Sequence, residues 1–237
     1  MERGYGQICP VAMASEVFAQ RWTPIILREL LAGSCRFNDI WRGAPLMSRA
    51  LLARRLRDLE AAGVIRSVPR SKGRGREYHL TEAGQEFRDV IERLGAWGQR
   101  WTVRVDPQNL DAGFLMWNLR RRMARDRLPP SRTVVRFDFR RIPSCHRGPR
   151  TFWLLLERPE VELCIEDPGY EVDLYVEADL TALAQAWLGD VPFSSVLRSG
   201  DVELTGSRTL VRDFPTWWLL SPFARVPRPS GAHVAAS

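Results

Sequence analysis

The chain has 237 residues, enough for one large domain or two ordinary ones. Of these residues 45% are hydrophobic and 27% charged, which is typical of a globular protein. It contains no run of about 18 apolar residues, and its start lacks the basic segment and apolar stretch of a secretory signal. We therefore expect a cytoplasmic protein without a membrane span. The net charge of +7 is uneven: residues 1–105 and 106–151 each carry +7, whereas residues 152–237 carry −7. The basic part suits an anionic partner.

The sequence offers few groups for catalysis or metal binding. Its four cysteines (Cys9, Cys35, Cys145 and Cys164) stand far apart, which is typical of reduced thiols and not of a zinc site or a disulfide framework. No nucleophile-elbow, zinc-protease or phosphate-loop motif occurs, and the three histidines are scattered. We expect no enzyme, no cofactor and no metal.

The first hundred residues predict short helices followed by two strands and a longer helix. RWTPIILRELLAG places Thr23 as a cap and Pro24 at the first helical position, with Gly33 as the stop. A short helix is expected at 37–41, and Ser48 and Gly63 bound the next helix. VIRSV and REYHL read as strands, and Thr81 caps a helix that ends near Trp101. This order predicts a winged helix-turn-helix.

The helix expected at 48–62 has two different faces. Four leucines fall within one arc of about 140°, and Arg55 projects into that arc, which predicts a buried ion pair for it. The opposite face carries arginines interleaved with small alanines: Arg49, Ala50, Ala53, Arg54 and Arg57. Such a face can approach a DNA groove, where arginine binds phosphate and guanine edges. An ordinary amphipathic helix with a solvated basic face would show the same pattern.

The stretch RSKGRGREY joins the two expected strands. It carries the basic residues Arg70, Lys72, Arg74 and Arg76 on a glycine-containing turn. A charge run of this kind is usually solvated surface. Its position between two short strands, directly after the arginine–alanine helix, favours a wing that contacts phosphate.

Residues 9–101 resemble the HxlR-type winged helix-turn-helix of bacterial transcriptional regulators. The resemblance rests on the motifs RWTPIIL, RFNDI, SRALLARRLRDLEAAGVI and EYHLTEAG. It implies a homodimer on double-stranded DNA, with dimer contacts from the first helix, the helix ending at Trp101 and the following segment. We expect the DNA-contacting residues to be Arg36, Ser48, Arg49, Ala50, Ala53, Arg54, Arg57, Arg70, Lys72, Arg74 and Arg76. The resemblance also makes Cys9 a candidate redox sensor, although QICPVA supplies no activating base.

Residues 106–132 form the expected helical basic connector between two domains. FLMWNLRRRMARDRLPPS predicts an amphipathic helix that ends at Pro129–Pro130. Its arginines can flank DNA or pair with the acidic last third of the chain. We favour a linker or interface role, because the apolar side of this helix needs burial.

From Thr133 the hydrophobic pattern changes to a period of two residues. TVVRFDFR, TFWLLLE, VELCIED and EVDLYVEAD predict four antiparallel strands, each with one buried face. DLTALAQAWLG and VPFSSVLRSG predict helices, DVELTG a short strand, and SRTLVRDFPTWWLLSPF a final helix. The whole chain is thus expected to be α+β, with domains at 1–105 and 133–226 and a disordered tail at 227–237.

The second half resembles the sterol carrier protein fold. The resemblance rests on DLYVEADLTALAQAWLG and SGDVELTGS, and it implies an α/β sandwich with a mostly antiparallel five-stranded sheet that can enclose an apolar tunnel. The candidate lining residues are Phe152, Trp153, Trp187, Phe193, Phe214, Trp217 and Trp218. These rings can instead simply fill a core. We expect a regulator modulated by an apolar or aromatic small molecule; the alternative is a hydrophobic-ligand or lipid carrier whose winged helix contacts a protein.

Overall fold

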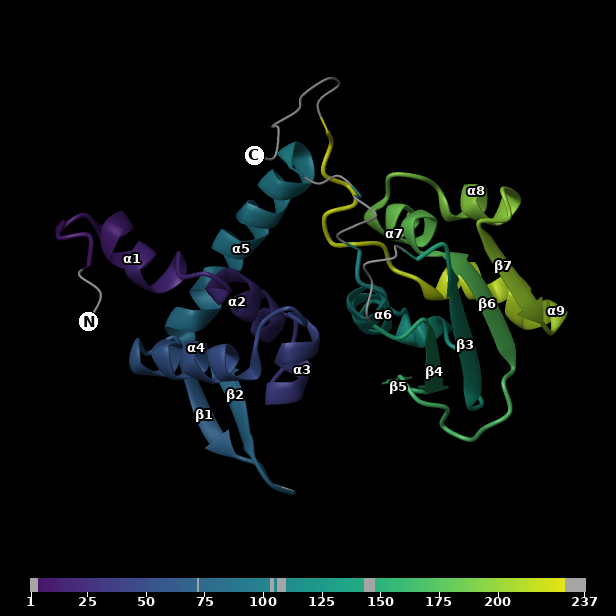
Figure 1. Cartoon of the computed structure of the whole chain (residues 1–237), viewed down its shortest axis with the longest axis horizontal. Coiled ribbons are helices and arrows are strands. Elements are labelled where there is room, and N and C mark those ends of the chain that lie inside the picture. Colours follow the sequence, from purple (N-terminus) through teal and green to yellow (C-terminus); the bar gives the residue numbers. More distant parts are fainter. Residues whose placement is uncertain (1–3, 72, 103–104, 106–109, 143–147, 229–237) are drawn as a thin grey trace. The chain divides into compact units, whose positions relative to one another are not determined.

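The computed structural model describes residues 4–71, 73–102, 105, 110–142 and 148–228 (Figure 1). By its internal contacts the chain divides into two compact units, Met1–Gly95 and Ala96–Ser237. Each unit has its own hydrophobic cluster and its own sheet. Residues 229–237 of the tail that the sequence predicts to be disordered lie outside the described residues.

The first unit is a winged helix-turn-helix, as the sequence predicts. Its elements in chain order are α1 (Pro10–Phe18), α2 (Thr23–Leu31), α3 (Phe37–Arg42), α4 (Arg49–Ala61), β1 (Ile65–Pro69), β2 (Arg76–Leu80) and the first part of α5 (Glu82–Trp101), whose residues from Ala96 onward are grouped with the second unit. β1 and β2 pair antiparallel, with Ile65 opposite Leu80. The core is formed by the apolar faces of α2 and α4 together with Ile40, Val64 and Ile65.

Most of the helix ends predicted for the first unit are confirmed, and one is wrong. The Ser48 hydroxyl accepts the backbone N–H of Leu51 at the start of α4, and Gly63 follows that helix with φ 70°. Thr23, in contrast, is the first helical residue of α2 and is 2% exposed. The N-cap of α2 is Trp22, which has φ 78° and offers no side-chain cap. A sequence pattern cannot reveal this, because a left-handed tryptophan is rare and tertiary packing must impose it.

A buried carboxylate joins α2 to the turn after α3. Glu29 is fully buried and pairs with Arg28, whose Nη2 lies 2.8 Å from its Oε1. The same Arg28 nitrogen donates to the Gly43 carbonyl oxygen at 2.7 Å. An added Cβ at Gly43 would overlap the Glu29 carboxylate, so a larger residue there would displace this buried group.

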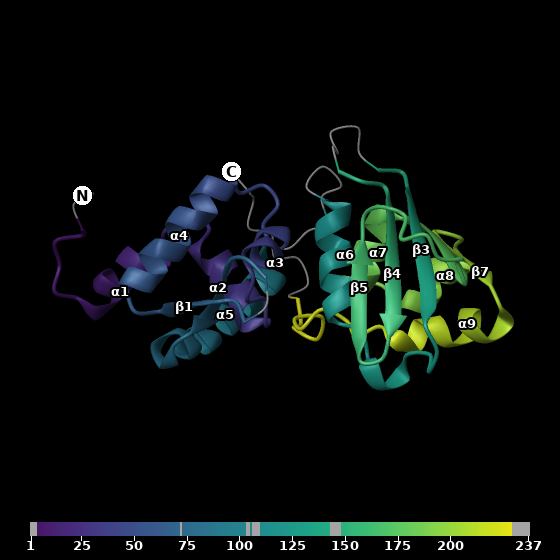
Figure 2. The ribbon, with the colours of Figure 1, turned by 90° about the horizontal axis from the view of Figure 1, so that it is seen from below.

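The second unit contains a five-stranded sheet with helices packed on one face (Figures 1 and 2). The strands, in the order β5-β4-β3-β6-β7, are β3 (Thr133–Arg140), β4 (Thr151–Glu157), β5 (Glu160–Cys164), β6 (Leu174–Asp179) and β7 (Val202–Gly206). Neighbouring strands pair antiparallel except β3 and β6, which are parallel. The sheet is therefore mostly antiparallel, as expected, and the β3–β6 pair is the exception to the simplest interpretation of the period-two pattern, in which the strands are antiparallel. A crossover between the two strands, which the sequence pattern does not encode, makes them parallel.

The period-two pattern of the strands is confirmed by burial. In β3, Val135, Phe137 and Phe139 are buried in the core, while Arg136 and Asp138 on the other face are partly exposed. The helices that share this core are α6 (Ala112–Arg121), α7 (Leu180–Leu188) and α8 (Phe193–Arg198). Asp179 caps α7 by accepting the Ala182 N–H at 2.9 Å.

The segment expected as a connector packs into the second unit. Leu115, Met116 and Leu119 of α6 belong to its hydrophobic core, so the apolar side of this helix is buried there. The helix is shorter than predicted, because it ends at Arg121 and not at Pro129. A 3-10 turn (Arg125–Arg127) lies between the two positions. The Arg122 carbonyl oxygen instead accepts the Leu219 N–H at 2.9 Å, and the next residue, Met123, forms an antiparallel β-bridge with Trp218.

The last helix is also shorter than predicted. α9 covers Arg208–Asp213, a 3-10 turn follows over Phe214–Trp217, and Trp218 is extended. Proline at position 215 cannot donate the backbone hydrogen bond that a continuing α-helix needs.

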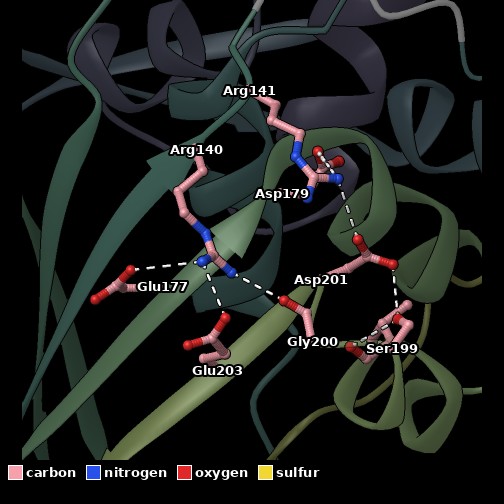
Figure 3. A network of polar contacts seen from close by, with 9 residues as sticks. Arg140, Arg141, Glu177, Asp179, Ser199, Gly200, Asp201 and Glu203 are labelled. Atoms are coloured by element: carbon pink, nitrogen blue, oxygen red, sulfur yellow. Dashed lines mark hydrogen bonds and ion pairs between the residues drawn. The ribbon is translucent and has the colours of Figure 1, made fainter.

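Two arginines at the end of β3 tie this strand to its neighbours (Figure 3). Arg140 bonds Glu203 at 3.0 Å and the Gly200 carbonyl oxygen at 3.0 Å, and it lies 3.7 Å from Glu177. Arg141 lies 3.3 Å from Asp201 and 3.6 Å from Asp179, the residue that caps α7. These contacts join β3, β6, β7 and α7 at one end of the sheet.

Candidate nucleic-acid interface

The two faces of α4 differ as the helical wheel predicts. Leu52, Leu56 and Leu59 are buried in the first core. The opposite face presents Arg49, Ala50, Arg54 and Arg57 as exposed residues, with Ala53 partly exposed. Because alanine adds little bulk, this face can lie close to a flat or grooved partner, and its arginines give it positive charge.

Arg55 forms an ion pair, as its position predicts, but the pair is not buried, because the Asp58 side chain is 52% exposed. The Arg55 side chain is 15% exposed, and its Nη1 donates to Asp58 Oδ2 at 3.2 Å. Its Nε donates to the Arg21 carbonyl oxygen at 3.2 Å. Arg55 therefore links α4 to the turn before α2 and lies apart from the exposed arginine face.

Arg49 is held by residues of α3. Its guanidinium carbon lies 4.6 Å from the centre of the Trp41 ring, and its Nη1 donates to Asn38 Oδ1 at 2.9 Å. Neither Asn38 nor Trp41 was among the predicted site residues. No local sequence pattern predicts these two partners of Arg49, because the contact joins α3 and α4 across a turn.

The basic stretch 70–78 lies between β1 and β2, and its last three residues, 76–78, already belong to β2. Gly73 and Gly75 have φ of 81° and 110°, conformations that other residues rarely adopt. The Arg70 N–H donates to the Gly75 carbonyl oxygen at 3.2 Å and closes the turn. Arg74 is exposed at its tip, whereas Lys72 lies outside the described residues.

Arg76 is bonded within the hairpin. Its Nε donates to the Ser67 hydroxyl at 2.9 Å and its Nη2 to the Ser67 carbonyl oxygen at 3.0 Å. Ser67 in turn donates its hydroxyl and its backbone N–H to Glu60 Oε1, at 2.6 and 2.9 Å. The set Glu60–Ser67–Arg76 thus links the end of α4 to both strands, and the sequence pattern did not predict it.

The Glu60 contact predicts a pH-dependent stability. The two hydrogen bonds from Ser67 hold the pKa of Glu60 below its ordinary value of 4.5. A carboxyl with a lowered pKa in the folded state stabilises that state above the ordinary value, and this contribution is lost as the pH falls through the lowered one. We expect Glu60→Gln to lower the urea midpoint near pH 7 and to differ less from wild type near pH 3. Equal differences at both pH values would contradict this.

Arg36 lies at the start of α3, beside β2. Its Nε is 3.9 Å from Glu77 Oε1, and the two residues form an isolated β-bridge. The preceding Cys35 carbonyl oxygen accepts the Tyr78 N–H at 2.8 Å. Residues 35–36 thereby extend the hairpin sheet, and the Arg36 side chain remains 55% exposed.

Four of the aromatic residues expected around a tunnel form one cluster in the second unit. Phe214 packs against Trp217 and Trp218, with ring centres 5.5 and 5.1 Å apart, and against Phe193 at 6.1 Å. Phe152 is buried in the same core, and Trp187 packs at its edge. Trp153 lies on the opposite face of the sheet, where Arg136 stacks on it at 5.6 Å. The inclusion of Trp153 among the lining residues of one tunnel was therefore wrong, because its side chain lies on the other face of the sheet from Phe152.

Two pockets of the described residues lie beside α1 and are not lined by these rings. One, of about 90 Å³, is lined by residues of α1, α2 and α4, including Glu16, Thr23 and Arg55. The other is a wide hollow at residues 4–8. Among the described residues, no group of histidine, cysteine and acidic side chains could hold a metal ion. No helix in the described part of the chain has the length and hydropathy that a membrane span requires.

The cysteines differ in their surroundings. Cys9 is exposed at the start of α1. Cys35 is partly buried, and burial, with Glu77 nearby, raises the pKa of its thiol. A raised pKa lowers the thiolate fraction, so Cys35 is expected to be poorly reactive.

Comparisons with known proteins match the first part of the chain. The family model described as "HxlR-like helix-turn-helix" matches residues 17–106. YvaP of Bacillus subtilis (strain 168), named as an HTH-type transcriptional regulator, is 32% identical over 108 residues, which are 44% of this chain and 96% of YvaP. A regulator of the same description from Methanothermobacter thermautotrophicus (strain Delta H) is 33% identical over 95 residues, 40% of this chain and 72% of that protein. In the solved structure of the reduced transcriptional regulator YodB from B. subtilis, the match covers 39% of this chain and 93% of YodB, at 27% identity and a TM-score of 0.35.

Proposed function

Because the chain belongs to the HxlR-like helix-turn-helix family, we propose that it is a homodimeric transcriptional regulator that reads operator DNA through α4 and the β1–β2 wing. The observation that carries the proposal is the exposed arginine–alanine face of α4 next to a basic hairpin. The named relatives are transcriptional regulators, which supports DNA binding and gives no support to an enzymatic role.

The proposed DNA contacts fall into two classes. The α4 residues Arg49, Ala50, Arg54 and Arg57 enter the major groove, where base edges carry sequence information. Arg74 at the wing tip binds phosphate, which adds affinity without sequence preference. Arg76 supports the wing through Ser67, so its effect on DNA binding is indirect. Contacts by Arg36, Ser48, Ala53, Arg70 and Lys72 stay predictions.

Exposed apolar side chains on α1 and α5 support the homodimer. α1 buries none of its residues, and Val11 and Met13 are 73% and 57% exposed. On α5, Val90, Leu94 and Trp97 follow the spacing of a helical seam and are 44%, 46% and 53% exposed. Apolar residues at such spacing on exposed helices are typical of protein–protein contacts, and a second copy of the chain is the proposed partner.

We also propose that the second unit has the sterol-carrier-like fold. Its five strands, its helices on one face and the position of β7 after α8 support this proposal. An apolar or aromatic effector in this unit stays a prediction, because four of the rings considered for a tunnel, Phe193, Phe214, Trp217 and Trp218, pack in one cluster. A redox role for Cys9 likewise stays a prediction.

The experiment that tests the DNA-binding proposal is a salt titration with Arg74→Ala beside the wild type. For a protein that neutralises several phosphates, log Kd rises linearly with the logarithm of the salt concentration. We expect a steep slope for the wild type. Arg74→Ala should weaken binding to all duplexes alike and reduce the slope by about one. Arg88→Ala on α5 is the control and should leave the slope unchanged. A flat wild-type slope would contradict DNA reading, and an unchanged slope for Arg74→Ala would remove the wing tip from the interface.

A further inference from the structure

Arg49 differs from the other exposed arginines of α4 in that its position is fixed. It is the first residue of the helix, directly after the Ser48 cap. Trp41 covers one face of its guanidinium at 4.6 Å, and Asn38 accepts one of its N–H groups at 2.9 Å. Both partners lie on α3, so two elements determine where this guanidinium points.

The Trp41 ring is itself anchored. Its indole Nε1–H donates to the Met47 carbonyl oxygen at 2.8 Å, across the turn between α3 and α4. Met47 is 1% exposed, and the Trp41 ring packs against the first core. The ring is therefore a rigid base for the arginine that stacks on it.

Arg54 and Arg57 lack such restraint. Within the described residues, neither makes a hydrogen bond, an ion pair or a ring contact through its side chain, and both are exposed. A free arginine loses rotamer freedom when it binds, whereas a pre-ordered one has already lost most of it. Phosphate attraction tolerates a mobile charge, but bidentate reading of a guanine edge requires the guanidinium plane in one geometry.

We propose that Asn38 and Trp41 are positioning residues that hold Arg49 to read a guanine edge. Arg54 and Arg57 then supply mainly sequence-independent attraction to phosphate. Arg49 stays exposed, and the N–H groups that Asn38 does not occupy are available to the O6 and N7 atoms of guanine. This inference rests on the proposed DNA-binding function and adds which arginine discriminates between bases and what orients it.

The test uses the full chain and a duplex that the wild type selects from a random pool. The measured quantity is the ratio of affinities for the selected duplex and for a scrambled one. We expect Arg49→Lys, which keeps the charge but loses the fork, to reduce this ratio roughly 10- to 100-fold. Asn38→Ala should reduce it several-fold. In both variants the affinity for the scrambled duplex should fall much less than the affinity for the selected one, because both keep a positive charge at position 49. Arg88→Lys on α5 makes the same chemical change away from the interface and should alter neither value.

Replacing the guanines of the selected duplex by 7-deazaguanine provides an independent readout. This change removes the N7 acceptor, so the ratio of affinities should fall for the wild type. The ratio for Arg49→Lys, which is already reduced, should fall little further. Trp41→Leu should behave like Asn38→Ala. If Trp41→Leu does not fold, Asn38→Ala still decides the positioning role.

The outcomes separate the inference from the function on which it rests. If the wild type selects a sequence but Arg49→Lys keeps the full ratio, the reading role of Arg49 is wrong and the regulator proposal stands. If Arg49→Lys loses the ratio and Asn38→Ala keeps it, the positioning role is wrong. If the wild type selects no sequence, both proposals are wrong.

Discussion

Leu94→Glu is expected to convert the protein to a monomer and to weaken operator binding by two or more orders of magnitude. Leu94 lies on α5 between Val90 and Trp97 and is 46% exposed. In a dimer this side chain would be buried against the partner, and a carboxylate there would lose its hydration without gaining a counter-charge. Losing the dimer removes the second half-site contact, and linked binding of this kind contributes about 10²- to 10⁴-fold to affinity.

The control for this variant is Gln85→Glu on the same helix. Gln85 is exposed and accepts a hydrogen bond from Arg88 at 3.2 Å. It lies on the opposite side of α5 from Leu94, because residues repeat every 3.6 positions along the helix. The control therefore adds the same charge outside the proposed seam. Sedimentation velocity and operator titration should show a dimer with near-wild-type affinity for Gln85→Glu. A dimer with unchanged affinity for Leu94→Glu would contradict the proposed interface.

Gly84→Ala is expected to destabilise the first unit by about 2–3 kcal/mol, although alanine is the better helix former. The start of α5 lies against the chain before β1: the Thr81 hydroxyl donates to the Gly63 carbonyl oxygen at 2.7 Å, and its Oγ1 lies 3.1 Å from the Val64 carbonyl oxygen. An added Cβ at Gly84 would overlap the Val64 carbonyl oxygen and touch Leu80. The backbone carbonyl cannot rotate away, so α5 must shift from the wing.

Gly98→Ala provides the matched control within α5. Its added Cβ would meet the Thr102 hydroxyl at 3.6 Å, an ordinary contact. We expect this variant to gain about 0.4–1 kcal/mol, because alanine restricts the unfolded chain. Native-state hydrogen exchange of peptides from β1 and β2 reports on the first unit separately from the second. Unchanged protection of these peptides in Gly84→Ala would show that α5 does not need this close approach.

The first unit could be predicted largely from its sequence because its signals are local. Ser48 and Gly63 bound α4, and the leucine spacing sets its buried face. Trp22 escaped prediction because its left-handed conformation depends on packing that no short pattern records. The positions of the α4 arginines were predictable, but their partners were not: Asn38 holds Arg49 and Ser67 holds Arg76 through contacts between separate elements.

In the second unit, alternation of apolar residues predicted the strands but not their pairing. The parallel pairing of β3 with β6 depends on a crossover connection, which a period of two residues does not predict. The helix over residues 112–121 was expected, yet its incorporation into the second core depends on long-range contacts of Leu115 and Leu119. The aromatic residues could be counted but not placed, which is why Trp153 was grouped with rings on the other face of the sheet.

The most direct test of the central proposal is selection of duplexes from a random pool by the full chain, followed by footprinting on the selected sequence. The proposal predicts an enriched, two-fold symmetric site whose half-sites lie about one helical turn apart or a multiple of it. Its affinity should exceed that for a scrambled duplex by about 10³-fold or more. Recovery of no preferred sequence, or equal affinity for selected and scrambled duplexes, would contradict the reading of operator DNA by α4.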